Sequence, residues 1–244
     1  MELQKSTWLE VEDYLQSCQT ILIPIGSTEQ HGPSGMIGTD SMIAEAITKE
    51  LARRSGLMCA PVLSIGMAEH HMAFAGTISL QPQTLSLVIR DVVHSLEVHG
   101  FAEFIFINGH GGNGPVLQRT FQEDVTNCRF YNWYMGAETR KLRASLYADQ
   151  EGRHATPSEI AVVQYLDEST LRNVACDPVC APALAYEGAQ DMRDKHPDGR
   201  IGANVSLADP ADGKRLFETS VNDLMETLIK EGTIAPPQHP SERG

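Results

Sequence analysis

The sequence lacks the features that would assign it to a membrane protein or a nucleic-acid-binding protein. No uninterrupted apolar run approaches the roughly 20 residues that a membrane-spanning helix needs. Basic residues are scarce, because 19 Lys and Arg stand against 32 Asp and Glu, which leaves a formal net charge of −13. A surface this acidic repels phosphate backbones and anionic lipids. The composition therefore favours a small molecule as the partner and disfavours nucleic acid and membranes.

Cysteine is also sparse and shows no pattern of pairs. The five cysteines are scattered, and residues 1–8 lack the basic-then-apolar pattern of a secretion signal, so we expect a cytoplasmic protein with reduced thiols. Cys176 and Cys180 form a CxxxC pair with Pro178 between them and no second pair nearby. This spacing predicts two ordinary thiols rather than a zinc site.

The chain of 244 residues has the length of one α/β domain. We expect residues 1–232 to form this domain and residues 233–244, with three prolines and no apolar pattern, to form a flexible tail. Apolar patterns predict strands at 20–25, 57–63, 103–107 and 129–134, and helices at 39–55, 85–96, 116–125, 159–166 and 216–229. Strands that alternate with helices predict a mostly parallel sheet covered on both faces, a three-layer α/β/α sandwich. Residues 177–210, rich in Gly, Pro, Asp and Ala, are predicted to form a long loop over the site.

Side chains that can bind metal gather in the loops that follow the predicted strands. In an open parallel sheet, ligands bind beyond the carboxyl ends of the strands, where these loops converge. The residues concerned are Glu29, His31, Asp40, His70, His71 and His110. The sequence therefore predicts a polar site at one end of the sheet.

The spacing of the first three of these residues favours a shared ligand site. Glu29 and His31 are two apart, so both point to one face of an extended segment, and Asp40 can turn toward the same point. With His110 they form a mixed carboxylate and imidazole set that suits Zn, Mn or Fe, and a shared carboxylate would permit a dinuclear centre. For any one of these residues alone, a helix cap, a turn or a surface position is the simpler interpretation.

Residues 109–114 have the form of a dinucleotide-binding fingerprint, GxGxxG after a strand and before a helix. That fingerprint requires an acidic residue at the end of the following strand, and none occurs before Glu138. Pro115 also follows the last glycine directly. A nicotinamide- or flavin-dependent enzyme is therefore the disfavoured alternative, and the glycines are better explained by a close approach of the backbone to a metal-bound ligand, with amide N–H groups available to an oxyanion.

In four of its segments the sequence resembles the creatininase family of metal-dependent hydrolases. The matching segments are Ile23-Pro-Ile-Gly-Ser-Thr-Glu-Gln-His-Gly-Pro33, Gly38-Thr-Asp40, Phe74-Ala-Gly-Thr-Ile-Ser-Leu80 and Asn108-Gly-His-Gly-Gly-Asn113, and the resemblance runs from Ile21 to about Ile229. It implies that Glu29, His31, Asp40 and His110 are metal ligands and that Asp40 bridges two divalent ions of Zn, Mn or Fe. It also implies a homo-oligomer, often a hexamer in this family.

The resemblance implies one further glutamate ligand. In creatininase proper it lies two residues after the loop histidine, where this chain has Gly112. Other members carry it in a later His-Ala-Gly-Glu-x-Glu-Thr-Ser segment, which is similar to residues 154–161 here, so that Glu159 would complete the site. Glu218-Thr-Ser220 is a literal match without a preceding His-Ala, and we interpret it as solvated surface of the last helix.

His154 takes the place of the family histidine that shuttles protons. A neutral imidazole near the metal can protonate a leaving amine, although a surface histidine that caps the next helix is the alternative interpretation. His71, Thr77 and Trp133 are candidate substrate contacts, and a core position explains Trp133 equally well.

The resemblance implies hydrolysis of a carbon–nitrogen bond, other than a peptide bond, in a small amide, cyclic amide or formamide by a metal-bridged hydroxide. Gly112 and the segment Ser34-Gly-Met-Ile37, where relatives often have His-Leu-Pro-Leu, disfavour creatinine as the substrate. Cleavage of a peptide, ring opening of a keto-inositol, and a non-catalytic metabolite-binding protein of the same fold remain alternatives.

Overall fold

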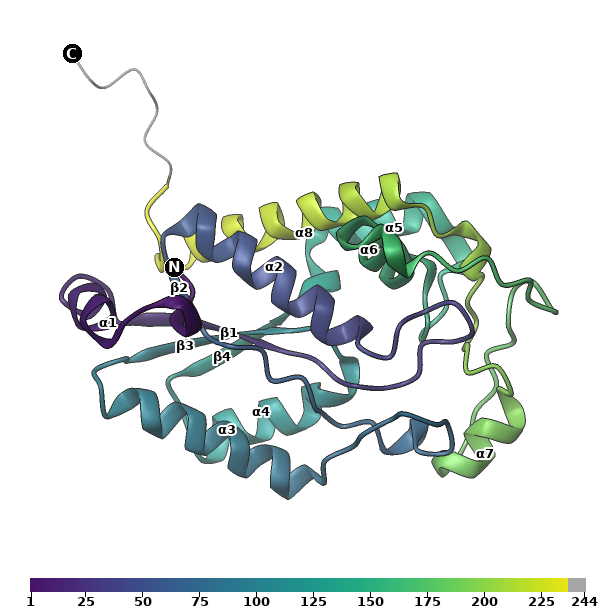
Figure 1. Cartoon of the computed structure of the whole chain (residues 1–244), viewed down its shortest axis with the longest axis horizontal. Helices are drawn as coiled ribbons and strands as arrows, with labels where there is room; N and C mark the ends of the chain where they lie inside the picture. Colours follow the sequence, from purple (N-terminus) through teal and green to yellow (C-terminus); the bar gives the residue numbers. More distant parts are fainter. Residues whose placement is uncertain (237–244) are drawn as a thin grey trace, which may run out of the picture.

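A four-stranded parallel sheet lies between two layers of helices in the computed structural model, which describes residues 1–236 (Figure 1). The strands are β1 (Thr20–Ile25), β2 (Met58–Cys59), β3 (Glu103–Asn108) and β4 (Cys128–Asn132), in the order β2-β1-β3-β4. The α-helices are α1 (Trp8–Leu15), α2 (Thr39–Ser55), α3 (Pro82–Glu97), α4 (Gly114–Glu123), α5 (Ala137–Tyr147), α6 (Pro157–Leu166), α7 (Gly188–Lys195) and α8 (Pro210–Lys230). The predicted three-layer α/β/α fold is confirmed.

The two central strands, β1 and β3, are buried on both faces because their side chains alternate between two apolar cores. Ile21 and Ile23 of β1 join Phe104 and Phe106 of β3 in the core beneath α3 and α4. Leu22, Ile105 and Ile107 point the other way, into the core beneath α2 and α8. Strands buried on both faces read as continuous apolar runs, which is why both were recognisable from the sequence.

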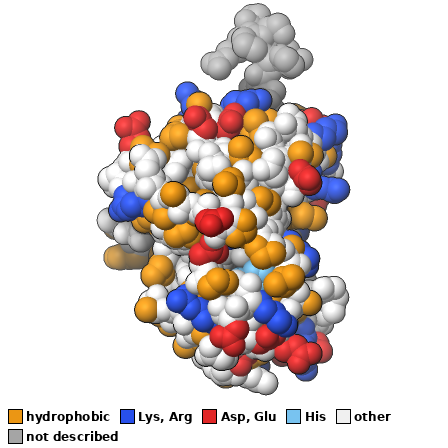
Figure 2. All heavy atoms as spheres, turned by 90° about the vertical axis from the view of Figure 1, so that its right-hand side faces the viewer, with side chains coloured by type: hydrophobic (Ala, Val, Ile, Leu, Met, Phe, Trp, Pro, Cys, Tyr) orange, Lys and Arg blue, Asp and Glu red, His pale blue; other side chains and the backbone are white. Residues whose placement is uncertain are grey.

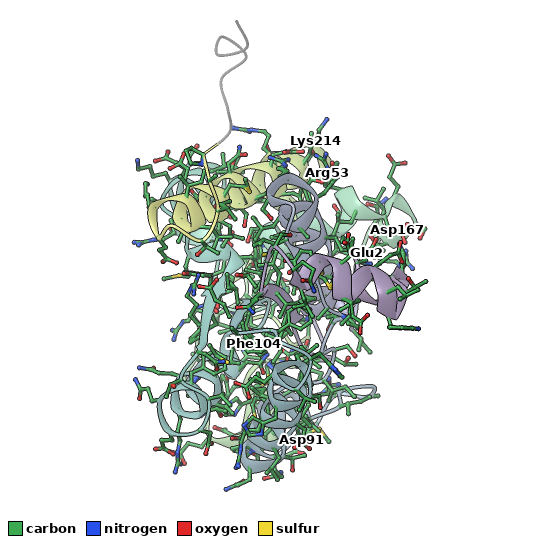
Figure 3. The ribbon with its side chains drawn as sticks, turned by 90° about the vertical axis from the view of Figure 1, so that its left-hand side faces the viewer. Glu2, Arg53, Asp91, Phe104, Asp167 and Lys214 are labelled. Carbon is green, nitrogen blue, oxygen red and sulfur yellow. The ribbon has the colours of Figure 1, made fainter. Side chains whose placement is uncertain are left out.

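The end-on view shows the resulting layers (Figure 3). Arg53 on α2 and Lys214 on α8 mark one outer layer, Asp91 on α3 marks the other, and Phe104 on β3 lies between them. Helices α2, α6 and α8 contact one another on the first face, and α5 packs on α8. Within residues 1–236, none of the helices combines the length and the apolarity that crossing a lipid bilayer requires.

The second strand is shorter than its predicted span of 57–63. Regular pairing ends at Cys59, because the next two N–H donors to β1 are three residues apart, Ala60 and Leu63, whereas their acceptors on β1 are only two residues apart. The segment nevertheless stays beside β1, since the Ala60 N–H donates to the Leu22 carbonyl at 2.8 Å and the Leu63 N–H to the Pro24 carbonyl at 2.9 Å.

Three helices were absent from the prediction, and the last one begins earlier than predicted. Helix α1 carries a capping box between Thr7 and Glu10, a local signal that could have revealed it. Helices α5 and α7 were also missed, and α7 interrupts the loop predicted at 177–210. Helix α8 starts at Pro210 with Asp209 as its N-cap, six residues before the predicted start at Leu216.

The boundary predicted for the C-terminal tail at residue 233 is too early. The N–H groups of Thr233 and Ile234 both donate to the Leu228 carbonyl, and Ile234 packs against the core beneath α2 and α8. The rest of the predicted tail, 237–244, lies outside the described residues.

Candidate metal centre

The predicted site residues meet at the carboxyl end of the sheet, where the loops after β1 and β3 approach the start of α6. Glu29 and His31 lie on the β1–α2 loop, Asp40 in the first turn of α2, and His110 in the β3–α4 loop. The backbones there are tightly packed, because a Cβ atom on Gly109 would lie 2.1 Å from the Asp40 carbonyl oxygen. The face of the molecule at this end exposes a histidine near its centre, between basic and apolar side chains (Figure 2).

Three overlapping groups of ligand atoms lie close enough to hold a metal ion. Within each group the ligand atoms lie within 4.8 Å of one another, and the groups are Glu29–Asp40–His110, His31–Asp40–Glu159 and Glu29–His31–His154. All five predicted ligands occur in the first two groups. Asp40 belongs to both of these groups, which is the arrangement that a bridging carboxylate requires.

Asp40 directs its two carboxylate oxygens at different histidines. Oδ1 lies 3.1 Å from Nε2 of His31, and Oδ2 lies 3.0 Å from Nδ1 of His110. The Asp40 side chain is 2% exposed, so water does not screen these interactions. The single carboxylate of Asp40 therefore contacts two separate imidazoles.

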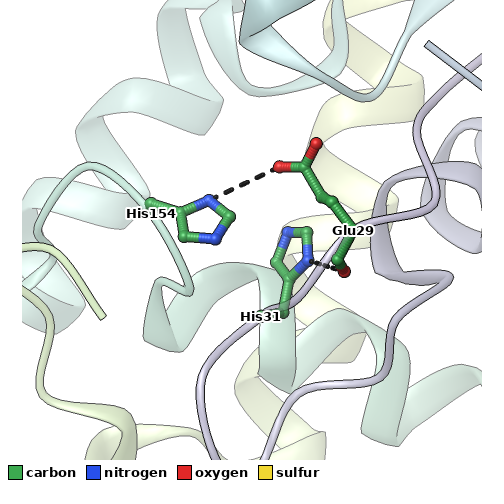
Figure 4. Close-up of side chains that lie close together, drawn as sticks. All are labelled: Glu29, His31 and His154. Carbon is green, nitrogen blue, oxygen red and sulfur yellow. Dashed lines mark hydrogen bonds and ion pairs between the residues drawn. The ribbon is translucent and has the colours of Figure 1, made fainter. Parts of the chain in front are cut away.

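Glu29 faces the other side of the cluster with one oxygen. Its Oε2 accepts a hydrogen bond from the Ser27 hydroxyl at 2.7 Å, whereas Oε1 lies 3.3 Å from Nδ1 of His110. Oε1 also lies 3.7 Å from Nδ1 of His154 (Figure 4). Ser27 thus fixes the carboxylate and leaves Oε1 directed into the cluster.

Backbone carbonyls orient the two candidate histidine ligands, His31 and His110, so that the second ring nitrogen of each faces the carboxylates. Because a carbonyl only accepts, Nδ1–H of His31 donates to the Glu29 carbonyl at 3.2 Å, and Nε2–H of His110 donates to the Met67 carbonyl at 2.8 Å. The remaining nitrogens, Nε2 of His31 and Nδ1 of His110, face the carboxylates. A metal-binding histidine is commonly oriented in this way.

Buried polar atoms without hydrogen bonds support a cation at this place. Oε1 of Glu29, Nε2 of His31 and Oδ2 of Asp40 are buried without a hydrogen-bond partner, although each faces another member of the cluster at 3.0–3.3 Å. Such orphaned atoms are costly unless something compensates them. Three carboxylates and two imidazoles with inward-facing donor atoms fit a divalent transition metal.

The pKa values of these groups reflect burial and mutual attraction. Burial raises the pKa of Glu29 to about 7. Burial opposes the charge on Asp40, but His31 and His110 outweigh it and hold the pKa of Asp40 well below its usual range. In turn, burial lowers the pKa of His31 and His110, and the neighbouring carboxylates outweigh it and raise these values to about 10 and about 9. The carboxylates of the cluster therefore favour a positive charge at His31 and His110.

Glu159 is held by the start of α6. Thr156 and Glu159 form a capping box, in which Oε2 of Glu159 accepts the Thr156 N–H at 2.8 Å. The other oxygen remains available to the cluster. Burial raises the pKa of Glu159 in this position. Glu159 therefore both caps α6 and offers an oxygen to a candidate ligand group.

Gln30, which the sequence analysis did not single out, connects His71 and His154. Its side-chain N–H donates to Nδ1 of His71 at 2.9 Å, while its backbone carbonyl accepts Nε2–H of His154 at 2.7 Å. His71 therefore directs Nε2–H at Oε1 of Glu29, 3.3 Å away, and His154 directs an unprotonated Nδ1 at the same oxygen. Burial lowers the pKa of both histidines, that of His71 to about 3, so both are neutral.

The two other candidate substrate contacts, Thr77 and Trp133, do not lie together. Thr77 accepts the backbone N–H of Gln30 at 3.3 Å and so supports the β1–α2 loop. Trp133 is 1% exposed and packs in the core beneath α2 and α8, so its ring forms no part of the cavity wall. The next residue, Tyr134, lines the cavity instead. Trp133 is thus placed as the core interpretation expected.

The remaining interpretation of the sequence concerned Glu218 and Ser220 on α8. Glu218 is partly exposed and pairs with Arg54 on α2, away from the cluster. Ser220, by contrast, is fully buried and donates its hydroxyl to the Trp133 carbonyl at 2.7 Å. The prediction of solvated surface is therefore wrong for Ser220.

A cavity of about 650 Å³ opens onto the cluster. Its lining includes Asp40, His71, His110, His154 and Glu159, with Arg143, Arg153 and Tyr186 around them. Tyr186 belongs to the segment before α7, and α7 contacts the short 3₁₀ helix at Glu69–His71. Part of the segment 177–210, which we predicted to lie over the site, therefore lines this cavity.

Comparison with known proteins shows which family the chain belongs to. The family model described as creatininase, creatinine amidohydrolase, matches residues 4–228. A mycofactocin precursor peptide peptidase of Mycobacterium ulcerans (strain Agy99) is 28% identical over 228 residues, which cover 86% of this chain and 85% of the relative.

Solved creatininases share the fold over nearly the whole chain. A manganese creatininase superposes with a TM-score of 0.83 and 20% identity over 96% of this chain and 99% of that one. A creatininase variant complexed with creatine gives a TM-score of 0.81 and 21% identity over 97% and 99% of the two chains. The chain belongs to the creatininase family of metal-dependent hydrolases.

Proposed function

We propose that this protein is a metal-dependent amidohydrolase with two divalent ions, which cleaves the carbon–nitrogen bond of a small amide, cyclic amide or formamide. The observation that carries the proposal is the pair of ligand groups, Glu29–Asp40–His110 and His31–Asp40–Glu159, that share one carboxylate at the floor of a cavity. When bound there, divalent ions polarise a carbonyl group and lower the pKa of water to about 7, which supplies the nucleophile.

The chain's own residues provide orientation and proton transfer. Nδ1 of His154 is unprotonated and lies at the cavity, so it can accept a proton and deliver it to the leaving nitrogen. Nε2–H of His71 faces Oε1 of Glu29 and keeps that carboxylate directed at the cluster. Gln30 holds both imidazoles in these tautomers.

The donor set favours Zn, Mn or Fe as the bound metal. Carboxylate oxygens and imidazole nitrogens accept all three, whereas Ca²⁺ prefers an all-oxygen site. The manganese in a creatininase of the same fold supports this choice.

A peptide substrate is the second candidate. Its support is the mycofactocin precursor peptide peptidase, which aligns with 86% of this chain. A cavity of about 650 Å³ accommodates a small amide or the end of a peptide. Both reactions break an amide carbon–nitrogen bond, so the same residues serve either one.

The proposal is tested by metal content and turnover together. We expect two Zn or Mn ions per chain in the protein, almost none in Asp40→Asn, and an unchanged content in Asp91→Asn, an exposed carboxylate on α3. The loaded protein is then assayed against formamides, lactams, linear amides, short peptides and a cyclic ketone. Hydrolysis of an amide class that Asp40→Asn abolishes supports the proposal.

Three results would contradict it. Unchanged metal content in Asp40→Asn would remove the shared carboxylate from the site. Turnover of the cyclic ketone alone would replace amide hydrolysis by ring opening, and ligand binding without any turnover in the metal-loaded protein would indicate a binding protein. The cytoplasmic location and the homo-oligomer remain predictions, and sedimentation of the purified chain measures the oligomer.

A further inference from the structure

Arg153 lies in the wall of the cavity without a partner for its charge. In the part of the chain that the structure describes, its guanidinium makes no hydrogen bond and no ion pair, although most arginines there pair with a carboxylate, among them Arg54, Arg129 and Arg200. The side chain is exposed and lines the cavity. An unpaired cation at this place is unexpected in a chain with a net charge of −13.

The backbone of Arg153 is fixed rather than free. Its N–H donates to the Ile201 carbonyl at 2.8 Å, and the Ile201 N–H donates to the His154 carbonyl at 3.2 Å. This bridge fixes the segment of Arg153 and its neighbour His154 against Ile201, and the imidazole of His154 belongs to one of the candidate ligand groups. The backbone position of Arg153 relative to the cluster is therefore set by the fold.

The second arginine of the wall has its charge compensated. Nε and Nη2 of Arg143 bind one oxygen of Glu151 at 2.9 and 2.6 Å, and the guanidinium lies 5.5 Å from the centre of the Tyr134 ring. Arg143 thus supports the wall, and Arg153 is the cation that remains available to a ligand.

The carboxylates that line the cavity belong to the candidate metal-ligand groups and are not partners of Arg153. Asp40 and Glu159 are the only acidic residues among its lining residues, and both belong to the candidate ligand groups. With two divalent ions in place, their charge is neutralised, and the wall then carries net positive charge at Arg153. Such a site attracts an anionic group and repels a cationic one.

We propose that Arg153 selects substrates that bear a carboxylate close to the amide bond that is cleaved. This proposal rests on the proposed amide hydrolysis and names its substrate class. A carboxylate bound at Arg153 would form charge-assisted hydrogen bonds with the guanidinium and direct the amide toward His154 and the ligand groups. N-acyl amino acids are the smallest compounds of this class.

The test compares two probes that differ only in charge, N-acetylglycine and N-acetylglycinamide. Their binding to the zinc-loaded protein is measured by calorimetry, which requires no turnover. We expect the wild-type protein to bind N-acetylglycine about tenfold more tightly, and this preference to weaken as salt is added. Arg153→Gln should abolish the preference, and Arg153→Lys should retain part of it.

Arg140→Gln is the matched control. Arg140 is an exposed arginine on α5 that also lacks a carboxylate partner within residues 1–236, and it lies outside the lining of this cavity. This variant should keep the wild-type preference. Metal content and thermal unfolding of all three variants establish that the site and the fold are intact.

The outcomes separate this inference from the proposed function. A preference that survives in Arg153→Gln would show that the metal ions alone bind the carboxylate, and would overturn the role of Arg153. A wild-type protein that does not distinguish the probes, or binds neither, would overturn it as well. If the preference depends on Arg153 but no amide in the panel is hydrolysed, the proposed reaction fails while the anion site stands.

Discussion

A Cβ atom on Gly112 would lie 2.4 Å from Nε2 of His110. It would also lie 2.7 Å from the Met67 carbonyl oxygen, which accepts the hydrogen bond that orients His110. A side chain at this position therefore displaces the imidazole. A glutamate at this position, as the resemblance leads us to expect in creatininase proper, would therefore clash with His110 as it lies in this chain.

Substitution of Gly112 should consequently damage the site rather than improve it. We expect Gly112→Glu, and also Gly112→Ala, to lower the affinity for Zn by at least about tenfold, since the orientation of a histidine ligand is lost. Gly114→Ala is the control, because a Cβ atom there meets nothing within 4 Å. Tighter Zn binding in Gly112→Glu would contradict this prediction, because it would show that a glutamate at position 112 can bind the metal.

Glu159 and Glu218 are the two candidates for the fifth ligand, and one pair of variants distinguishes them. Glu159→Gln keeps an oxygen for the Thr156 cap but loses the charge, so we expect about one metal ion less per chain in elemental analysis. Glu218→Gln weakens only the pair with Arg54 and should keep the full content. The reverse result would move the ligand to α8.

His154→Asn should separate metal binding from proton transfer. We expect this variant to retain its metal and to lose turnover of its amide by a factor of about 10²–10⁴, the usual contribution of a general acid or base. His154 also forms a group with Glu29 and His31 that could hold an ion. A loss of metal from His154→Asn would therefore identify His154 as a ligand, and full activity would end its proposed role.

Metal affinity should increase with pH. The carboxylates raise the pKa of His31 to about 10 and that of His110 to about 9, and burial raises that of Glu29 to about 7. At neutral pH an ion must therefore displace protons from both histidines, and this competition weakens only as the pH approaches 9–10.

Chelator competition at pH 6.5, 7.5 and 8.5 measures this dependence. Each displaced proton contributes up to about tenfold in affinity per pH unit. Calorimetry in two buffers of different ionisation enthalpy counts the protons released at neutral pH. An affinity that stays constant over this range, with no proton release, would contradict the charge state that the geometry indicates.

The sequence by itself determined the fold class and most of the elements of the sheet. Continuous apolar runs at β1 and β3 reflect burial on both faces, and the loops at their carboxyl ends hold the histidines and carboxylates. That Glu29, His31, Asp40 and His110 come together follows from this topology, because the carboxyl ends of parallel strands share one edge. Glu159 follows no strand, and it reaches the cluster because α6 packs against α2 and α8.

Only the tertiary structure decided what surrounds these residues. The sequence shows Gln30 between two ligand candidates, where strand alternation predicts that it points away, yet the folded loop brings its amide to His71. Trp133 and Tyr134 are adjacent aromatic residues, and only the packing of α8 decides that the first enters the core and the second lines the cavity. Local periodicity encodes which residues are buried, whereas contacts between distant segments, such as that of Arg153 with Ile201, depend on how the loops pack in three dimensions.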